Sequence, residues 1–148
     1  MDKQLRTTSI LLHVATTLLV LFGIFMVVNV FVLGKLPGRM ELIIGKTSAE
    51  IAAYDASVFI FMLSAYRMFT ILLLTYTVGL TLLTNAYRQG NAVAGRVVFV
   101  MQGLFLPIST VNALSVSSQT PWPIFALSGV FTLIAFLISR GVTATKSD

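Results

Sequence analysis

Long apolar runs separated by short polar segments make up most of this chain. A helix needs roughly 20 apolar residues to cross a hydrocarbon core of about 30 Å, because each residue rises about 1.5 Å and lipid offers no partner to an unpaired backbone group. Four runs meet that length, at about residues 9–33, 58–84, 97–116 and 122–139. The pattern therefore predicts an all-α, polytopic integral membrane protein with four transmembrane helices.

The segments that join the runs are short, except for one. Residues 85–95 contain two asparagines and two glycines and fit only a tight hairpin, and the turn after residue 116 is shorter still. Short connections between long helices favour an up-down-up-down four-helix bundle. We therefore expect residues 1–148 to form one transmembrane domain, in which residues 34–57 are an extracytoplasmic loop.

This loop carries a signal for the start of an interfacial helix. Thr47 and Glu50 have the spacing of a capping box, in which each side chain pairs with a free backbone N–H of the first turn, so a helix is expected to begin near Ser48. A single helix from there to Thr84 would be about 55 Å long, which exceeds the bilayer core. Its first turns must either project from the membrane or bend along its surface.

The basic residues that flank the runs predict the orientation, because lysine and arginine are retained on the cytoplasmic side. With the N-terminus inside, the cytoplasmic flanks contain Lys3, Arg6, Arg88, Arg96, Arg140 and Lys146. The outer flanks then contain Lys35, Arg39 and Lys46. The prediction is a multi-pass protein of the plasma membrane with both termini in the cytoplasm.

The composition agrees with a membrane protein and argues against nucleic-acid binding and cysteine chemistry. Hydrophobic residues are 57% of the chain, and the formal net charge of +5 is dispersed rather than gathered into a basic run, so no nucleic-acid partner is expected. The chain has no cysteine, which excludes disulfides and thiol chemistry.

Arg67 is the only charge well inside an apolar run. At about 1.5 Å per residue it lies some 13 Å beyond Val58, where a buried arginine costs about 2.5–3.5 kcal/mol. Ser64 and Thr70 share its side of the helix. One interpretation is that Arg67 extends to the headgroups of the outer interface, and the other is a site for an anion or a polar headgroup inside the bundle.

A second polar stripe lies on the third run, where Gln102, Ser109 and Asn112 fall within roughly a quarter turn of one another and Pro107 removes a backbone hydrogen bond between them. Such a stripe indicates either a lined cavity or interhelical hydrogen bonds. The candidate ligand-binding set combines both stripes and consists of Ser64, Arg67, Thr70, Gln102, Ser109 and Asn112.

The sequence predicts neither catalytic residues nor a cofactor or metal. No nucleophile–base arrangement or paired carboxylates emerge. His13 is the only histidine, and a metal or haem would need further ligands, which only a symmetric oligomer could supply as a second His13. An interfacial structural histidine is the simpler interpretation.

In size and layout the chain resembles small DoxX-like four-helix membrane proteins. The resemblance is carried by the first run, the loop with Pro37, the Ala65-Tyr66-Arg67 segment with Gly79 beyond it, and the hairpin before Arg96. It covers nearly the whole chain and implies the four-helix fold, but it implies no particular activity because that group is functionally mixed.

We therefore expect a non-catalytic membrane protein that is partnered first by the lipid bilayer. Its polar intramembrane site would bind a lipid-like or quinone-like molecule, or the chain would be an accessory subunit of a membrane complex. The alternative is a homo-oligomeric channel or small transporter for anions, with Arg67 at a constriction.

Overall fold

A computed structural model describes residues 3–37, 41, 44–116 and 122–144. Most of the described residues are helical, and none of them lies in a strand. The elements in chain order are α1 (Lys3–Val27), the π-helical segment η1 (Val28–Val32), α3 (Ser48–Tyr54), α4 (Ala56–Arg88), α5 (Ala92–Val116) and α6 (Trp122–Ala144). Arg39 and Lys146, which entered the orientation prediction, lie outside the described residues.

The four predicted runs correspond to helices that are long and apolar enough to cross a membrane. These candidate spans are Lys3–Val32, Ala56–Arg88, Ala92–Leu114 and Pro123–Arg140. The helices extend past the predicted runs, most clearly where α1 begins at Lys3 rather than residue 9. Hydropathy marks only the part of a helix suited to hydrocarbon, whereas backbone hydrogen bonds continue into the headgroup region, where polar side chains are tolerated.

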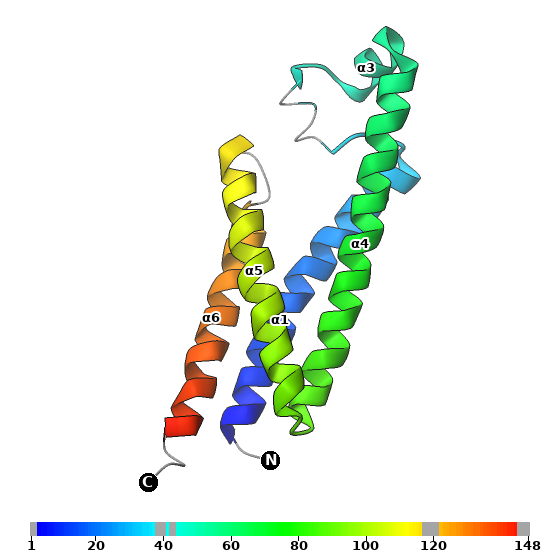
Figure 1. The fold of residues 1–148 in the computed structure, drawn as a ribbon. Helices are drawn as coiled ribbons and strands as arrows, with labels where there is room; N and C mark the ends of the chain where they lie inside the picture. The colour runs from blue at the N-terminus through cyan, green and yellow to red at the C-terminus, as the bar shows by residue number, and fades with distance from the viewer. Residues whose placement is uncertain (1–2, 38–40, 42–43, 117–121, 145–148) are drawn as a thin grey trace.

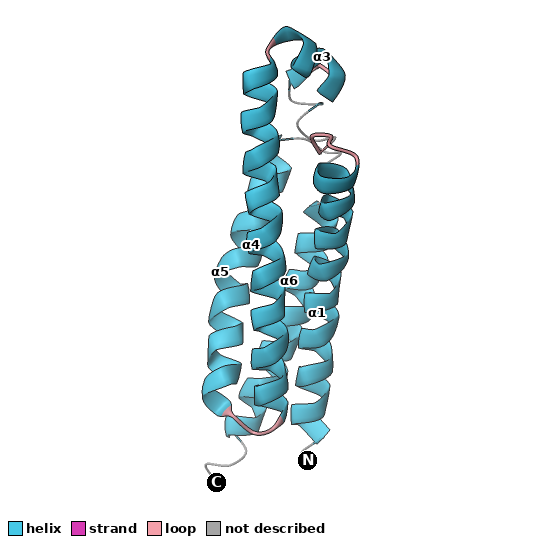
Figure 2. Ribbon diagram, turned by 90° about the vertical axis from the view of Figure 1, so that its right-hand side faces the viewer, coloured by secondary structure: helices cyan, strands magenta, loops and turns pink. Residues whose placement is uncertain are grey.

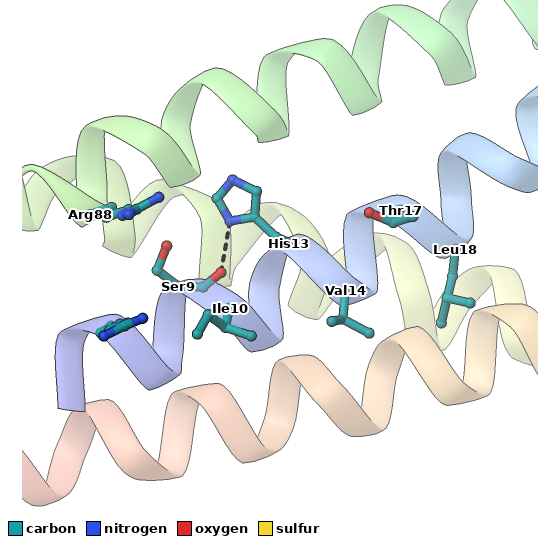
Figure 3. Close-up of a pocket in the computed structure, with 8 residues that line it drawn as sticks. Ser9, Ile10, His13, Val14, Thr17, Leu18 and Arg88 are labelled. Carbon is teal, nitrogen blue, oxygen red and sulfur yellow. Dashed lines mark hydrogen bonds between the residues drawn. The ribbon is translucent and has the colours of Figure 1, made fainter. Parts of the chain in front are cut away.

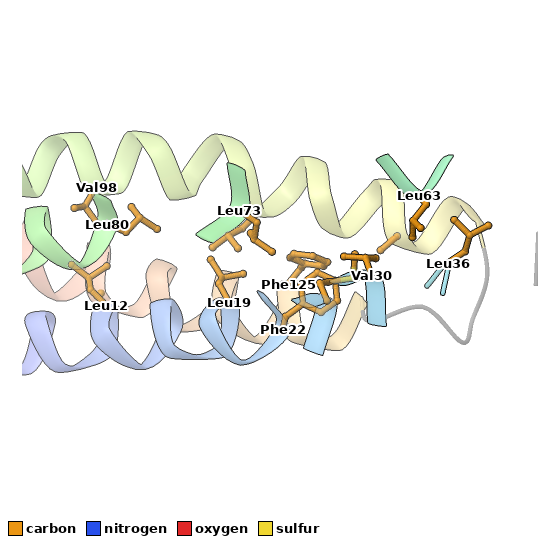
Figure 4. Close-up of a cluster of buried hydrophobic side chains, with 14 of the residues drawn as sticks. Leu12, Leu19, Phe22, Val30, Leu36, Leu63, Leu73, Leu80, Val98 and Phe125 are labelled. Carbon is orange, nitrogen blue, oxygen red and sulfur yellow. The ribbon is translucent and has the colours of Figure 1, made fainter. Parts of the chain in front are cut away.

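The helices pack as a ring in the order α1, α6, α5, α4 and back to α1. On each helix, residues that are three and four positions apart form one stripe that faces the other helices. On α1 the buried stripe includes Thr8, Leu12, Ala15, Leu19, Phe22 and Met26. On α4 it is Leu63, Thr70, Leu73, Thr77, Leu80 and Thr84. Figure 4 shows the buried apolar side chains as one continuous cluster along the bundle.

Small residues let the helix backbones approach closely, as is usual for helices in lipid. A Cβ atom added to Gly23 of α1 would lie 2.7 Å from Leu74 Cδ2 of α4. Ala113 of α5 and Ala135 of α6 are fully buried in the same way. The N- and C-terminal ends of the chain lie at the same end of the bundle, as Figure 1 shows.

The helix predicted near Ser48 is confirmed as α3, and its capping box is complete. The Glu50 N–H donates to Thr47 Oγ1 (3.3 Å), and the Thr47 N–H donates to Glu50 Oε2 (2.7 Å). The chain then bends at Asp55, whose Oδ1 accepts from the backbone N–H groups of Ser57 (2.9 Å) and Val58 (3.1 Å) and so caps α4. Figure 2 shows α3 folded back beside the start of α4.

Candidate functional site

Arg67 is half-buried and caps the C-terminal end of the first helix. Its Nε–H donates to the Val30 carbonyl oxygen (3.0 Å), and its guanidinium lies over the Phe31 ring, 5.5 Å from the centroid. The last carbonyls of a helix have no partner within that helix, and a cation there also opposes the negative end of the helix dipole. These contacts give Arg67 a structural role between α4 and η1.

The π-helical turn beside Arg67 coincides with a side-chain hydrogen bond to the helix backbone. The Asn29 side-chain Nδ2–H donates to the Phe25 carbonyl oxygen (2.8 Å), which is the acceptor that the Asn29 backbone would use in an α-helix. At the end of this turn the Leu33 N–H donates to the Val28 carbonyl oxygen (2.9 Å), five residues back. The wider turn accompanies the contact between the Val30 carbonyl and Arg67.

The other two polar candidates on α4 do not share one environment. Ser64 is exposed, on the side of the helix that faces away from the bundle. Thr70 is fully buried, and its hydroxyl donates to the Tyr66 carbonyl oxygen of its own helix (2.8 Å). A threonine bonded in this way is already satisfied without a ligand.

Gln102 of α5 is fully buried at the centre of a polar network between three helices. Its Nε2–H donates to Thr16 Oγ1 of α1 (3.3 Å), and its Oε1 accepts a hydrogen bond from Thr132 Oγ1 of α6. The Thr16 hydroxyl in turn donates to the Leu12 carbonyl oxygen (2.9 Å). The amide is therefore satisfied by the protein itself, which matches the interhelical interpretation of this residue.

Ser128 of α6 adds a direct contact between α6 and α1 to this network. Its hydroxyl lies within hydrogen-bonding distance of the Ala15 carbonyl oxygen of α1 (3.2 Å) and the Ile124 carbonyl oxygen of α6 (2.8 Å). Neither Ser128 nor Thr132 belongs to the candidate set predicted from the sequence. Their spacing of four residues opposite a buried glutamine is the signal that could have identified them.

The remaining candidates on α5 lie toward the outside. Ser109 is half-buried and Asn112 is exposed, while α5 passes through the exposed Pro107 without interruption. The candidate set is therefore divided between levels of the bundle. Thr16, which contacts Gln102, and Val30, which contacts Arg67, are fourteen residues apart on the first helix, or about 20 Å. Ligand binding by this set stays a prediction.

A pocket of about 490 Å³ lies elsewhere, at the end of the bundle where both termini lie. Its polar lining comes from Arg6, Ser9, His13 and Thr17 of α1 and from Arg88 at the end of α4. Figure 3 shows Arg88 and His13 on the side of α1 that faces α4. The two arginine side chains are exposed, and no acidic residue of the described chain lines the pocket.

His13 joins the two helices that form this pocket. Its Nδ1 lies 2.8 Å from the Ser9 carbonyl oxygen, and its Nε2 lies 3.1 Å from the side-chain Oδ1 of Asn85 of α4. These contacts fix the ring and hold α1 beside α4. Within the described residues, no group of three or more histidine, aspartate and glutamate side chains could hold a metal ion.

The rest of the pocket is apolar. Ile10, Val14 and Leu18 line it at intervals of four residues, which places them in one row along α1. From Ile10 to Leu18 the helix rises about 12 Å, so the charged mouth continues into an apolar strip long enough to contact part of an acyl chain. The sequence did not indicate this pocket, because Arg88 reaches it only through the packing of α4 against α1.

Comparisons with protein-family models, with curated proteins and with solved structures found no match. The class of protein therefore rests on the chain itself, whose four long apolar helices indicate a multi-pass helical membrane protein. The resemblance to DoxX-like proteins likewise rests on the sequence features alone.

Proposed function

We propose that this protein is a non-catalytic integral membrane protein that binds a lipid-like molecule in the pocket between α1 and the end of α4. The observation that carries the proposal is the pocket lining, which joins two exposed arginines to a row of aliphatic side chains. An amphiphile would place its polar head against the arginines and its apolar tail against the aliphatic side chains. The lining contains no phenylalanine, tyrosine or tryptophan, which favours an acyl chain over a quinone.

The proposal includes an up-down-up-down bundle in the plasma membrane, with the pocket at its cytoplasmic side. Two observations support this topology. Both termini lie at one end in Figure 1, and α4 and α5 are separated only by the turn at residues 89–91. The described basic residues near that end include Arg6, Arg88, Arg96 and Arg140, which is the bias expected of a cytoplasmic face.

The contacts of Arg67 favour a structural role over a role in an anion pathway. The pocket is therefore the better candidate for a binding site. The Arg67 Nε–H is bonded to a backbone carbonyl and its guanidinium lies over Phe31, so the side chain supports the helix end. The relationship to DoxX-like proteins remains part of the proposal, and it adds the four-helix fold but no ligand.

Native mass spectrometry of the protein extracted in a mild detergent tests the proposal. The wild type should carry a reproducible additional mass of a lipid. Val14→Trp and Leu18→Trp would fill the apolar strip and should lower the lipid-bound fraction about tenfold, as expected when well over 1 kcal/mol of contact is lost. Val130→Trp, on the exposed surface of α6, is the matched control and should retain the lipid.

Two results would contradict the proposal. Equal lipid occupancy in the wild type and both tryptophan variants would show that the pocket is not the binding site. Recovery of the wild type only with other polypeptides in a fixed ratio, and without lipid, would instead indicate an accessory subunit of a membrane complex.

A further inference from the structure

We infer that the pocket selects lipids with an anionic phosphate headgroup, which Arg6 and Arg88 clamp from two different helices. The inference rests on the proposed lipid-binding function and adds the chemical class of the headgroup. It depends on three features of the pocket, namely its charge, its position along the bundle and the way its two sides are held together.

The charge of the mouth is positive without compensation from the described residues. Arg6 and Arg88 both line the pocket, whereas the described acidic residues Glu41, Glu50 and Asp55 lie around α3, at the opposite end of the bundle (Figure 1). A guanidinium presents several N–H donors in a plane and pairs with two phosphate oxygens at once. Two such groups at one mouth favour a phosphate headgroup with a net negative charge over a zwitterionic one, in which a bulky cation offsets the charge of the phosphate.

The position of the arginines matches the place of a headgroup. Arg6 lies near the start of α1 and Arg88 is the last residue of α4, so both stand where the apolar spans end. The aliphatic row of Ile10, Val14 and Leu18 begins one turn deeper and continues along the surface of α1 toward the middle of its length (Figure 3). A phosphate held at the mouth therefore directs its acyl chain along this row.

His13 connects α1 and α4, the two helices that carry Arg6 and Arg88. Its ring is fixed between the Ser9 carbonyl oxygen of its own helix and the Asn85 amide of α4, three residues before Arg88. This contact sets the spacing between the helices that carry the two arginines. His13 is thus a positioning residue for the clamp.

The test compares binding of two phospholipids with identical acyl chains, phosphatidylglycerol and phosphatidylcholine, to the full chain by native mass spectrometry. Basic residues near a membrane surface each contribute about fivefold to the binding of an anionic lipid. The wild type should prefer phosphatidylglycerol by about tenfold or more. The variant Arg6→Gln/Arg88→Gln should lose this preference, while Arg96→Gln, which removes one exposed charge near the same end, should keep it.

The outcomes separate the inference from the proposed function. If the wild type binds the two lipids equally, the phosphate inference is overturned and the lipid-binding proposal stands. This comparison needs no variant. Retained preference in a correctly folded double variant, checked by circular dichroism, would also overturn it. Displacement of phosphatidylglycerol by millimolar inorganic phosphate would show that the site takes free phosphate instead. Loss of lipid from the double variant without loss of selectivity would reduce the arginines to general contacts and contradict the clamp.

Discussion

Gln102 of α5 and Thr132 of α6 are hydrogen-bonded side chain to side chain inside the bundle, and both are shielded from lipid. Gln102 also donates to Thr16 of α1, so a single amide connects three of the four long helices. Lipid tails are as apolar as the helix surfaces, so the hydrophobic effect does not drive these helices together. A satisfied amide in the middle instead fixes their mutual rotation and register.

Disrupting this amide should weaken the bundle by a small and measurable amount. Gln102→Leu removes two interhelical hydrogen bonds, each worth about 0.6 kcal/mol on average, so the free energy of unfolding in mixed micelles should fall by about 1 kcal/mol. Combined with Thr132→Val it should give less than the sum of the single effects. Gln89→Leu, at an exposed position after α4, is the control. Strict additivity of the two changes would contradict a direct bond.

Arg67→Met should leave the Val30 carbonyl without its partner and lower the free energy of unfolding by about 1–3 kcal/mol. Arg67→Lys should recover only part of the loss, because an ammonium group lacks the planar surface that lies over Phe31. Arg96→Lys, at an exposed position on α5, should have no effect. Unchanged stability of Arg67→Met, together with altered anion flux in proteoliposomes, would favour the channel alternative.

Backbone amides of the loop beside α3 should be less protected from hydrogen exchange in acid. The Glu41 carboxylate accepts from the Ser48 hydroxyl (2.6 Å) and the Ser48 N–H (2.7 Å), and these bonds hold the pKa of Glu41 below its usual value. A lowered pKa means that the stabilising contribution is present above the unfolded value and is lost as the pH falls through the folded one.

Hydrogen exchange of the Ser48 and Leu36 amides, corrected for the intrinsic effect of pH, measures this loss. Exchange should accelerate on going from pH 6 to below the lowered pKa of Glu41, since the Leu36 N–H is bonded to the Ser48 hydroxyl (3.0 Å). Glu41→Gln should show much of the acceleration already at pH 6. A pH response of equal size in Glu41→Gln would rule out Glu41 as its origin.

Two glycines of α5 should respond oppositely to alanine. A Cβ atom at Gly95 would lie 2.6 Å from Tyr87 Cε2, so Gly95→Ala must displace the Tyr87 ring where the end of α4 meets the start of α5 and should cost about 1–3 kcal/mol. Gly103 has open space around it, and Gly103→Ala should raise the free energy of unfolding by about 0.5–1 kcal/mol, because alanine favours a helix. Thermal unfolding in detergent compares the two, and equal shifts would contradict the close approach.

Local sequence was sufficient for the elements of this protein. The four apolar runs predicted the long helices, and the capping box of Thr47 and Glu50 predicted where α3 begins. Both signals act over one helical turn or along one helix, so a single segment contains all the information. The ends of the helices were less predictable, because hydropathy changes at the headgroup region and the backbone hydrogen bonds continue beyond it.

Tertiary structure alone decided what each polar residue does. The sequence singled out Arg67 and Gln102 as members of one candidate site, but their partners on the first helix lie about 20 Å apart. No pattern in the sequence connects Arg6 with Arg88, which face one pocket only because α1 packs against α4. Hydropathy fixes how deeply a helix lies in the membrane, whereas its rotation and its neighbours depend on side-chain packing between segments far apart in the chain.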